Sequence, residues 1–230
     1  MNVLLILGID TSGKTAAAAL CSDNALQAQK SVYTRFTHSQ VILPMVRELL
    51  SDCGATLQEI DRFAVTVGPG SYTGLRIGIS AVRAMAYALD KPCAAVSTLE
   101  SLAWSCLPFD GLICPIMKAR GELVYSGLFK SDSVRLLREK KDKLTSQKDL
   151  YIEIAQCGKI MLTGDGAEDF FKEFSPKNTV LSPVTMRMQN AASLCLAAAY
   201  AEPVSYDMLS ADYFEITKAE KELLQKNKKN

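Results

Sequence analysis

The stretch AVTVGPGSYTGLRIGISAVRAMAYA, residues 64–88, decides how this chain folds. It opens with β-branched and apolar residues typical of a buried strand, and a Gly-Pro-Gly-Ser turn at residues 68–71 follows. Ser71 is expected to cap a helix that runs from Gly74 to Leu89. A strand that leads through a glycine turn into a helix exposes backbone N–H groups at the positive end of the helix dipole, which favours a phosphate or a carboxylate. The alternative is that the turn only reverses the chain.

The helix after this turn carries more apolar surface than a single face needs, so we expect it to be covered on more than one side. Gly78 costs about 1 kcal/mol relative to alanine in a helix interior, which predicts that another helix approaches closely there. The preceding segment from Thr37 to Cys53, which Gly54 ends, has the same excess of apolar residues. The covering helix belongs either to this chain or to a partner.

The composition is that of a globular protein with no strong charge. The chain has 230 residues, 48% of them hydrophobic, and a net charge of +1, which allows one domain or two compact lobes. A charge so close to zero provides no global field that attracts nucleic acid. Seven scattered cysteines and a single histidine argue against a zinc cluster. No apolar run is long enough to span a bilayer and no signal-peptide pattern is present, so we expect a cytoplasmic protein without a membrane partner.

Near the N-terminus, residues 8–15 match the phosphate-binding pattern G-x-x-x-x-G-K-[ST] and follow an apolar strand. A phosphate-binding loop of that kind would open a helix, but Ser22 to Asn24 form a strong turn signal soon after Thr15. A β-hairpin, with a further strand from Ala25 to Tyr33, fits the pattern at least as well. The residues alone leave both interpretations open.

The strand pattern restarts at Pro108 and divides the chain into an N-terminal lobe, residues 1–107, and a C-terminal lobe, residues 108–230. The last helices of the second lobe could pack back on the first. The charged segment from Ser131 to Lys148 fits a helix or a ribbon equally. The remaining pattern of the second lobe predicts strands at residues 112–117, 123–129, 159–163 and 179–181 and helices at 167–174 and 190–201.

Several motifs resemble a known family. They are LGIDTS at residues 7–12, THSQVILP at 37–44, VGPGSYTGLRIG at 67–78 and KARGELVY at 118–125. Their order and spacing are similar to the TsaB (YeaZ-like) family, the small non-catalytic relatives of the TsaD (Kae1-type) threonylcarbamoyltransferases. The resemblance implies an α/β, two-lobed actin/hexokinase/Hsp70-like (ASKHA) fold, with mixed sheets flanked by helices. In that fold the phosphate-loop match is the turn of a hairpin.

The same resemblance implies a function. The chain would be a non-catalytic dimerisation and scaffold subunit of the complex that makes N6-threonylcarbamoyladenosine (t6A) at position 37 of tRNA, and it would bind and activate the catalytic TsaD-type transferase. The implied partners are that paralogue as a heterodimer, a TsaE-type ATPase, tRNA through the complex, and a second copy as a homodimer when the chain is alone. No cofactor of its own is implied, because ATP or ADP and a metal are expected in the partner subunits. The alternatives are a P-loop-like NTPase and a glycopeptidase-like hydrolase.

The departures from the catalytic relatives favour the non-catalytic role. By spacing, the metal-binding His-x-x-x-His pair of those relatives falls on Thr98 and Leu102, and leucine cannot ligate a metal. The family often has an aspartate where this chain has Lys118. We therefore expect no catalytic residue and no metal site.

The resemblance also implies a partner interface, in which the helices matching residues 38–53 and 74–89 join those of the catalytic relative in a four-helix bundle. A stable interface should bury more than about 1,000 Å² in total. The expected interface residues are Leu43, Val46, Leu50, Leu75, Gly78, Ala81, Val82 and Met85. A nucleotide bound without turnover would contact Asp10, Thr11, Ser12, Gly68, Gly70 and Ser71.

Overall fold

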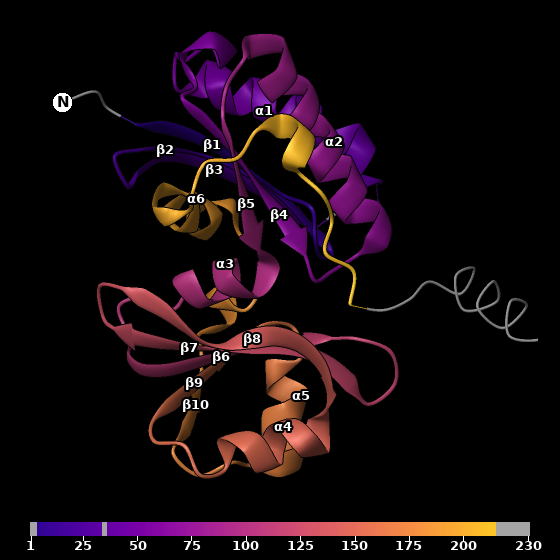
Figure 1. Cartoon of the computed structure of the whole chain (residues 1–230), viewed down its shortest axis with the longest axis vertical. Helices are drawn as coiled ribbons and strands as arrows, with labels where there is room; N and C mark the ends of the chain where they lie inside the picture. The colour runs from indigo at the N-terminus through magenta and orange to yellow at the C-terminus, as the bar shows by residue number, and fades with distance from the viewer. Residues whose placement is uncertain (1–3, 34–35, 215–230) are drawn as a thin grey trace, which may run out of the picture.

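The protein folds into two lobes, each built on a five-stranded sheet (Figure 1). The structure is a computed structural model that describes residues 4–33 and 36–214. The first sheet takes its strands from residues 5–97 and the second from residues 110–181. The end of the expected C-terminal lobe, residues 215–230, lies outside the described residues.

The first sheet combines an antiparallel hairpin with parallel strands. Its order is β3-β2-β1-β4-β5, with β1 antiparallel to β2 and parallel to β4. The strands are β1 (Leu5–Asp10), β2 (Thr15–Ser22), β3 (Ala25–Tyr33), β4 (Arg62–Gly68) and β5 (Cys93–Ser97). Two long helices, α1 (His38–Asp52) and α2 (Tyr72–Leu89), cover one face of this sheet, and the 3-10 helix η1 (Leu57–Glu59) precedes β4.

The second sheet repeats this pairing pattern. Its order is β10-β9-β6-β7-β8, with β6 antiparallel to β7 and parallel to β9. The strands are β6 (Asp110–Lys118), β7 (Leu123–Asp132), β8 (Leu136–Ser146), β9 (Ile160–Thr163) and β10 (Thr179–Leu181). Its helices are α4 (Gln147–Ile154) and α5 (Ala167–Phe174), and the 3-10 helix η2 (Val184–Met186) follows β10.

After the second sheet the chain returns to the first lobe. α6 (Ala191–Tyr200) packs on the face of the first sheet opposite α1 and α2. α3 (Thr98–Trp104) lies between the two sheets and contacts α6 as well as β6 (Figure 1). We call residues 201–214 the C-terminal strap. The strap includes the 3-10 helix η3 (Tyr206–Met208) and runs along the first lobe beside α2.

Alternation along the strands gives the first sheet two buried faces. Leu7 and Ile9 of β1 belong to the core under α1 and α2, whereas Ile6 belongs to the core under α6. The alanines at residues 16–19 of β2 are all fully buried. Their small side chains leave room for helices on both sides of the sheet.

The structure answers three questions that the residues left open. Residues 8–15 span the end of β1, the hairpin turn at residues 11–14 and the first residue of β2, so the chain continues into a strand and not into a helix. The hairpin interpretation is therefore confirmed. Ser71 caps α2, since its Oγ accepts a hydrogen bond from the backbone N–H of Gly74 at 3.2 Å. The segment from Ser131 to Lys148 comprises the end of β7, the turn that follows it, the long strand β8 and the start of α4.

Gly78 has a different role from the one predicted. A Cβ at this position would lie 2.4 Å from Oγ1 of Thr11 and 3.4 Å from Cγ2 of Val65. The Thr11 hydroxyl also donates a hydrogen bond to the carbonyl oxygen of Gly74 at 2.7 Å. The close approach is therefore between α2 and the end of β1 in the same chain, and the prediction of a second helix at Gly78 was wrong.

Candidate functional site

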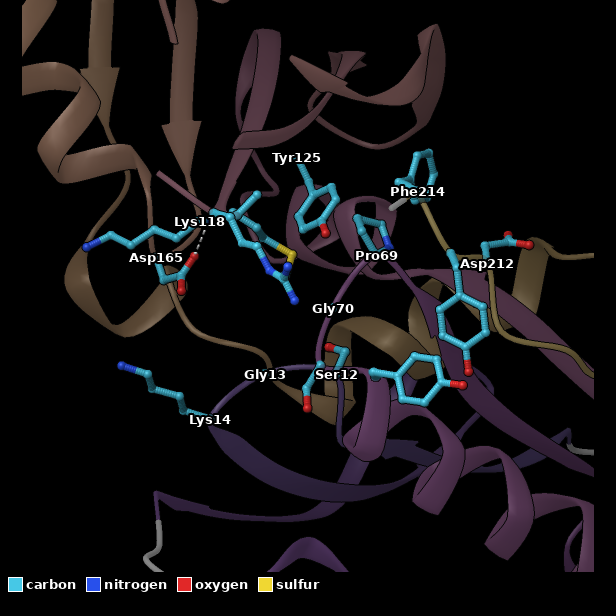
Figure 2. A pocket seen from close by; sticks show the side chains of 16 residues that line it. Ser12, Gly13, Lys14, Pro69, Gly70, Lys118, Tyr125, Asp165, Asp212 and Phe214 are labelled. Carbon is cyan, nitrogen blue, oxygen red and sulfur yellow. Dashed lines mark hydrogen bonds between the residues drawn. The ribbon is translucent and has the colours of Figure 1, made fainter. Parts of the chain in front are cut away.

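A cavity of about 780 Å³ lies between the two lobes (Figure 2). The loops after β1 and β4 form its wall on the first lobe, and the end of β6 with the following turn forms its wall on the second. The end of the C-terminal strap forms a third wall. Parallel strands bring their carboxyl ends to one edge of a sheet, which is where open α/β sheets place ligand sites.

On the first lobe the wall consists of the loops after β1 and β4, which are hydrogen-bonded to each other. The backbone N–H of Ser71 donates to the carbonyl oxygen of Ser12 at 2.7 Å. A Cβ on Gly70 would lie 2.3 Å from that oxygen, so the approach of the two loops requires glycine there. The start of α2 is thus fixed against the β1-β2 turn, and its first backbone N–H groups lie beside the cavity.

Asp10 is enclosed beneath this wall and does not line the cavity. Its Oδ1 accepts hydrogen bonds from the backbone N–H of Ser12 at 2.9 Å, from the Ser12 hydroxyl at 2.6 Å and from the Thr66 hydroxyl at 3.0 Å. Its Oδ2 is buried and has no hydrogen-bond partner among the described residues. Burial in this apolar setting raises the pKa of the Asp10 carboxyl, because the charged form loses its hydration.

The opening of the cavity is basic on one side. Lys14 of the first lobe and Lys118 of the second line it from opposite walls (Figure 2). The Nζ of Lys118 lies 2.6 Å from Oδ2 of Asp169, and this carboxylate raises the pKa of Lys118. The Lys118 backbone N–H donates to Oδ1 of Asp165 at 2.9 Å. Two carboxylates of the second lobe, those of Asp165 and Asp169, thus hold Lys118 at the opening of the cavity.

The opposite side of the cavity is aromatic. Tyr125 of β7 meets Phe214 of the strap there (Figure 2), and the stacked rings of Tyr72 of α2 and Tyr213 of the strap also line the cavity. Cationic side chains and aromatic rings around one cavity suit an anionic group carried by a planar ring. These rings could not be predicted from the sequence. Residues 72, 125 and 213–214 lie far apart in the chain and form no recognisable motif.

The structure divides the expected nucleotide residues into two groups. Ser12, Gly70 and Ser71 line the cavity, whereas Asp10, Thr11 and Gly68 do not. The cavity wall therefore presents backbone and hydroxyl groups that fit a phosphate or a carboxylate. The Asp10 side chain is fully buried and accepts hydrogen bonds from the hydroxyls of Ser12 and Thr66, so it offers no group to a ligand in the cavity.

The structure corrects the expected interface residues. Five of them are buried in the core that α1 and α2 form with the sheet of their own lobe, namely Val46, Leu50, Leu75, Val82 and Met85. Gly78 is buried against Thr11, as described above. These apolar side chains face the sheet of their own lobe and are buried there, so a partner cannot contact them. Leu43, which is 53% exposed, and Ala81, which is half-buried, do point outward.

The outward face of the two helices carries other residues that the sequence analysis did not select. Ile77 of α2 is half-buried, and Ala84 and Ala88, on the same side of that helix, are exposed. Together with Leu43 and Ala81 they form what we call the α1-α2 surface. The signal was available in the sequence, because the α2 members of this surface, residues 77, 81, 84 and 88, follow one another at helical spacing along one flank of the buried stripe.

The two positions that correspond to the metal pair of the catalytic relatives are both interior. Thr98 and Leu102 lie on α3 and are fully buried. Among residues 4–33 and 36–214, no three His, Cys, Asp or Glu side chains are grouped so as to hold a metal ion. No helix in the described part of the chain is long and apolar enough to cross a membrane.

Comparison with known proteins identifies the family. Residues 32–226 match the family described as "TsaD: tRNA N6-adenosine threonylcarbamoyltransferase". The tRNA threonylcarbamoyladenosine biosynthesis protein TsaB of Bacillus subtilis (strain 168) is 44% identical over 126 residues, which are 55% of each chain. This chain thus spans about half the length of that relative.

Solved structures agree with this match. A Pseudomonas aeruginosa protein, described as uncharacterized with similarity to peptidase YeaZ, has a TM-score of 0.79 and 25% identity, with 94% of this chain and all of that chain covered. The ROK hexokinase of Thermus thermophilus shares the fold alone, with a TM-score of 0.50 and 12% identity over 86% of this chain and 98% of that one. These likenesses confirm the expected two-lobed ASKHA fold.

The match covers most of the chain, so the chain belongs to the TsaD family. Within that family its similarities lie with the TsaB (YeaZ-like) proteins. The alternative of a P-loop-like NTPase is not favoured, because the residues of the pattern form a hairpin. The curated TsaB relatives are named for threonylcarbamoyladenosine biosynthesis and not for a glycopeptidase activity, so the hydrolase alternative is not favoured either.

Proposed function

We propose that this chain is a non-catalytic subunit of a tRNA N6-threonylcarbamoyladenosine (t6A37) biosynthesis complex, and that it binds and activates a TsaD-type transferase as a heterodimer. The observation that carries the proposal is the α1-α2 surface, an outward face of small and apolar residues on two neighbouring helices of a chain that belongs to this family. The names of its relatives, which place TsaB in threonylcarbamoyladenosine biosynthesis, support the pathway.

The α1-α2 surface has the chemistry of a helix-packing interface. Ala81, Ala84 and Ala88 succeed one another along α2 at spacings of three and four residues. Small side chains on such a row let a second helix approach closely, and Leu43 and Ile77 supply larger apolar groups beside it. Two helices of a partner laid across this surface would complete a four-helix bundle.

The buried residues of α3 support the proposal that the chain is non-catalytic. The family resemblance implies that the catalytic relatives carry metal-binding histidines at the positions that fall, by spacing, on Thr98 and Leu102. Leu102 has a hydrocarbon side chain packed in the core beside Leu99 and Phe129. A metal that polarises the transferred carbonyl would find no ligand at this position.

The remaining partners are part of the same proposal. A TsaE-type ATPase and tRNA would join through the complex, and ATP or ADP and a metal would be held by the partner subunits. When the chain is alone, the α1-α2 surface would be exposed apolar area, which favours a homodimer through the same face. A cytoplasmic location belongs to the same proposal, and the role of the relatives in tRNA modification supports it.

The direct test measures binding to the TsaD-type protein of the same organism by isothermal titration calorimetry. Leu43→Asp and Ala84→Glu put a charge on the α1-α2 surface, so each should weaken binding at least about tenfold. The matched control is Ile152→Asp, which charges a 69% exposed apolar residue on α4 of the other lobe and should leave the affinity unchanged. Equal affinities for all variants would overturn the proposal.

The NTPase alternative has its own measurement. Purified protein should show no ATP hydrolysis that Lys14→Ala removes, because Lys14 lies on a hairpin turn. Hydrolysis that disappears in this variant would revive the alternative.

A further inference from the structure

The C-terminal strap is an extended segment that follows α2 over its whole length. Val204 pairs with Cys93 in an antiparallel bridge at the start of the strap. Tyr206 then packs edge-on against Tyr87 of the last turns of α2, with ring centroids 5.3 Å apart. Leu209 is buried in the core of the first lobe. The strap is thereby anchored before it reaches the cavity.

The end of the strap lies directly on the glycine turn. The backbone N–H of Asp212 donates to the carbonyl oxygen of Val67 at 2.7 Å. A Cβ on Gly68 would lie 2.5 Å from the carbonyl oxygen of Asp212, and Gly68 has a φ of +128°. The turn therefore needs glycine here partly because the strap crosses it at contact distance.

Aromatic contacts continue this attachment on α2. The rings of Tyr213 and Tyr72 stack with centroids 4.7 Å apart. The Nε of Arg76 donates to the Tyr213 hydroxyl at 3.0 Å, and its guanidinium lies 4.0 Å from the centre of the Tyr72 ring. Tyr213 is thus held from two sides by the first turns of α2.

The next residue crosses to the second lobe. The ring of Phe214 meets that of Tyr125 of β7 edge-on, with centroids 6.0 Å apart. Asp212, Tyr213 and Phe214 also line the interlobe cavity, and Figure 2 shows Asp212 and Phe214 on the side of the cavity away from Lys14. The strap therefore bridges the two lobes along one wall of the cavity.

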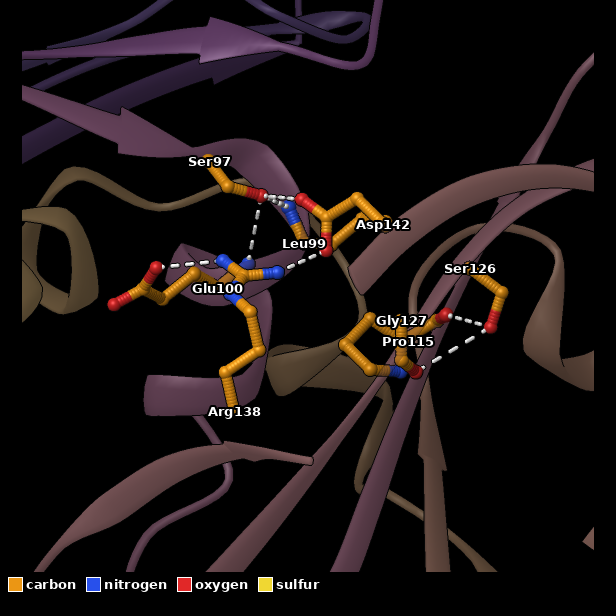
Figure 3. A network of polar contacts seen from close by, with 8 residues as sticks. All are labelled: Ser97, Leu99, Glu100, Pro115, Ser126, Gly127, Arg138 and Asp142. Carbon is orange, nitrogen blue, oxygen red and sulfur yellow. Dashed lines mark hydrogen bonds and ion pairs between the residues drawn. The ribbon is translucent and has the colours of Figure 1, made fainter. Parts of the chain in front are cut away.

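The lobes are also connected by a network of polar and charged side chains. The Ser97 hydroxyl at the start of α3 donates to Asp142 of β8, and Arg138 pairs with both Asp142 and Glu100 (Figure 3). Asp142 is little exposed, and several charged and polar groups share this network. The lobes are thus joined by a polar network at one place and by a ring-to-ring contact at the strap.

We propose that the end of the strap, residues 212–214, is a lid on the interlobe cavity. The lid stays attached to α2 through Tyr213 and opens at the contact of Phe214 with Tyr125, which gives a second access to the cavity on its aromatic side, away from the opening between Lys14 and Lys118. The polar network of Ser97, Asp142 and Arg138 keeps the lobes in place while the lid moves. The ring contact is suited to opening, because it has no charge to leave unpaired.

The test measures access to the cavity with a thiol probe. Ala119 lies in the turn after β6 and lines the cavity, so an Ala119→Cys variant can be titrated with 5,5′-dithiobis(2-nitrobenzoate), an anionic reagent. The native cysteines give a background that the parent protein measures separately. Adding Phe214→Ala should raise the reaction rate at position 119 by about threefold to tenfold, the range that loss of one aromatic pair allows. Tyr125→Ala should give the same increase.

The matched control removes a comparable ring contact far from the cavity. Phe174 stacks with Tyr151 in the second lobe at 5.3 Å, and Phe174→Ala should leave the rate at position 119 unchanged. An equal increase in this control would show general loosening and overturn the proposal. An unchanged rate in Phe214→Ala would overturn it as well. If Ala119→Cys fails to fold, hydrogen exchange of residues 67–75 and 118–125 replaces it, and these amides should exchange faster in Phe214→Ala and not in Phe174→Ala.

Discussion

The two lobes share one topology and use it for different purposes. Each has a sheet in which the first strand pairs antiparallel with the second and parallel with the fourth, and the loop after the fourth strand leads into a helix. In both lobes a glycine of that loop presses on the end of the first strand. Gly70 would meet the carbonyl oxygen of Ser12, and Gly164 would meet that of Ile116, if either had a Cβ.

The lobes differ at the last residue of the first strand. β1 ends at Asp10, which is fully buried and accepts three hydrogen bonds, whereas β6 ends at Lys118, which is exposed and paired with Asp169. One position in the topology thus carries a buried acidic residue in one lobe and an exposed basic residue in the other. In the first lobe the residue joins two loops, and in the second it faces the cavity.

The helices after the glycine loops differ as well. α2 has 18 residues and carries Gly74 and Gly78 where it crosses the β1-β2 turn, whereas α5 has eight residues. A long helix fixed closely to the sheet has a complete outer face, and that face is the α1-α2 surface. Under the proposed function, tight packing at the glycine loop of the first lobe would hold this helical face rigid for a partner.

The largest expected effect tests this tight packing. Gly78→Leu should lower the free energy of unfolding by about 3 kcal/mol or more, because no side chain fits between α2 and Thr11. Gly158→Leu in the second lobe should change it by less than about 0.5 kcal/mol, because a Cβ there meets nothing within 4 Å. Urea denaturation measures both. Similar losses in the two variants would remove the distinction between the lobes.

The second-largest effect on stability is expected at Asp10 and Lys118, the last residues of β1 and β6. Asp10→Ala should be about 2 kcal/mol less stable than Asp10→Asn, because asparagine keeps an oxygen that accepts from Ser12 and Thr66. Lys118→Ala and Lys118→Gln should differ little from each other, because this side chain is 54% exposed. Thermal unfolding of the four variants checks the contrast. A large difference within the Lys118 pair would contradict it.

A pH series sharpens the same comparison. The pKa of Asp10 is raised by burial, so its protonated form is the one that the folded state favours. Its contribution to stability is complete below the ordinary value of 3.8 and is lost as pH rises through the raised value. Unfolding midpoints measured from about pH 4 upward should therefore fall for the natural protein relative to Asp10→Asn. Parallel curves would show that Asp10 does not titrate in this way.

The smallest effect is expected at the polar network between the lobes. Arg138→Met removes the guanidinium that pairs with Asp142 and lies over the Phe129 ring, so we expect a loss of about 1 kcal/mol. Lys172→Met removes the exposed pair with Glu168 on α5 and should cause no measurable change in the unfolding midpoint. If the control loses as much as Arg138→Met, the network contributes no more than a surface ion pair.

Much of the fold could be predicted from local patterns. The strand before Gly68, the cap at Ser71 and the helix up to Leu89 were all expected and found. Local signals suffice there because caps and glycine turns act over a few residues. The segment from Ser131 to Lys148 could not be assigned, because its charged residues lie on an exposed edge strand and show no clear period.

The site was harder to predict. The turn residues Ser12, Gly70 and Ser71 were expected and do line the cavity, but the rings of Tyr125 and Phe214 come from segments far apart in the chain. The apolar residues of α1 and α2 were recognised as too numerous for one face, yet those selected as contacts proved to be core. Hydrophobicity alone does not tell the side facing the sheet from the side facing out.

By itself the sequence determined the family, the two lobes and the helix that follows the glycine turn, because motifs and short-range capping are written in consecutive residues. Only the tertiary structure decided that Gly78 accommodates Thr11, that Asp10 is sealed beneath the cavity and that the strap lies across the turn at Gly68. These facts depend on which distant segments come into van der Waals contact, and that is fixed by the packing of the whole chain.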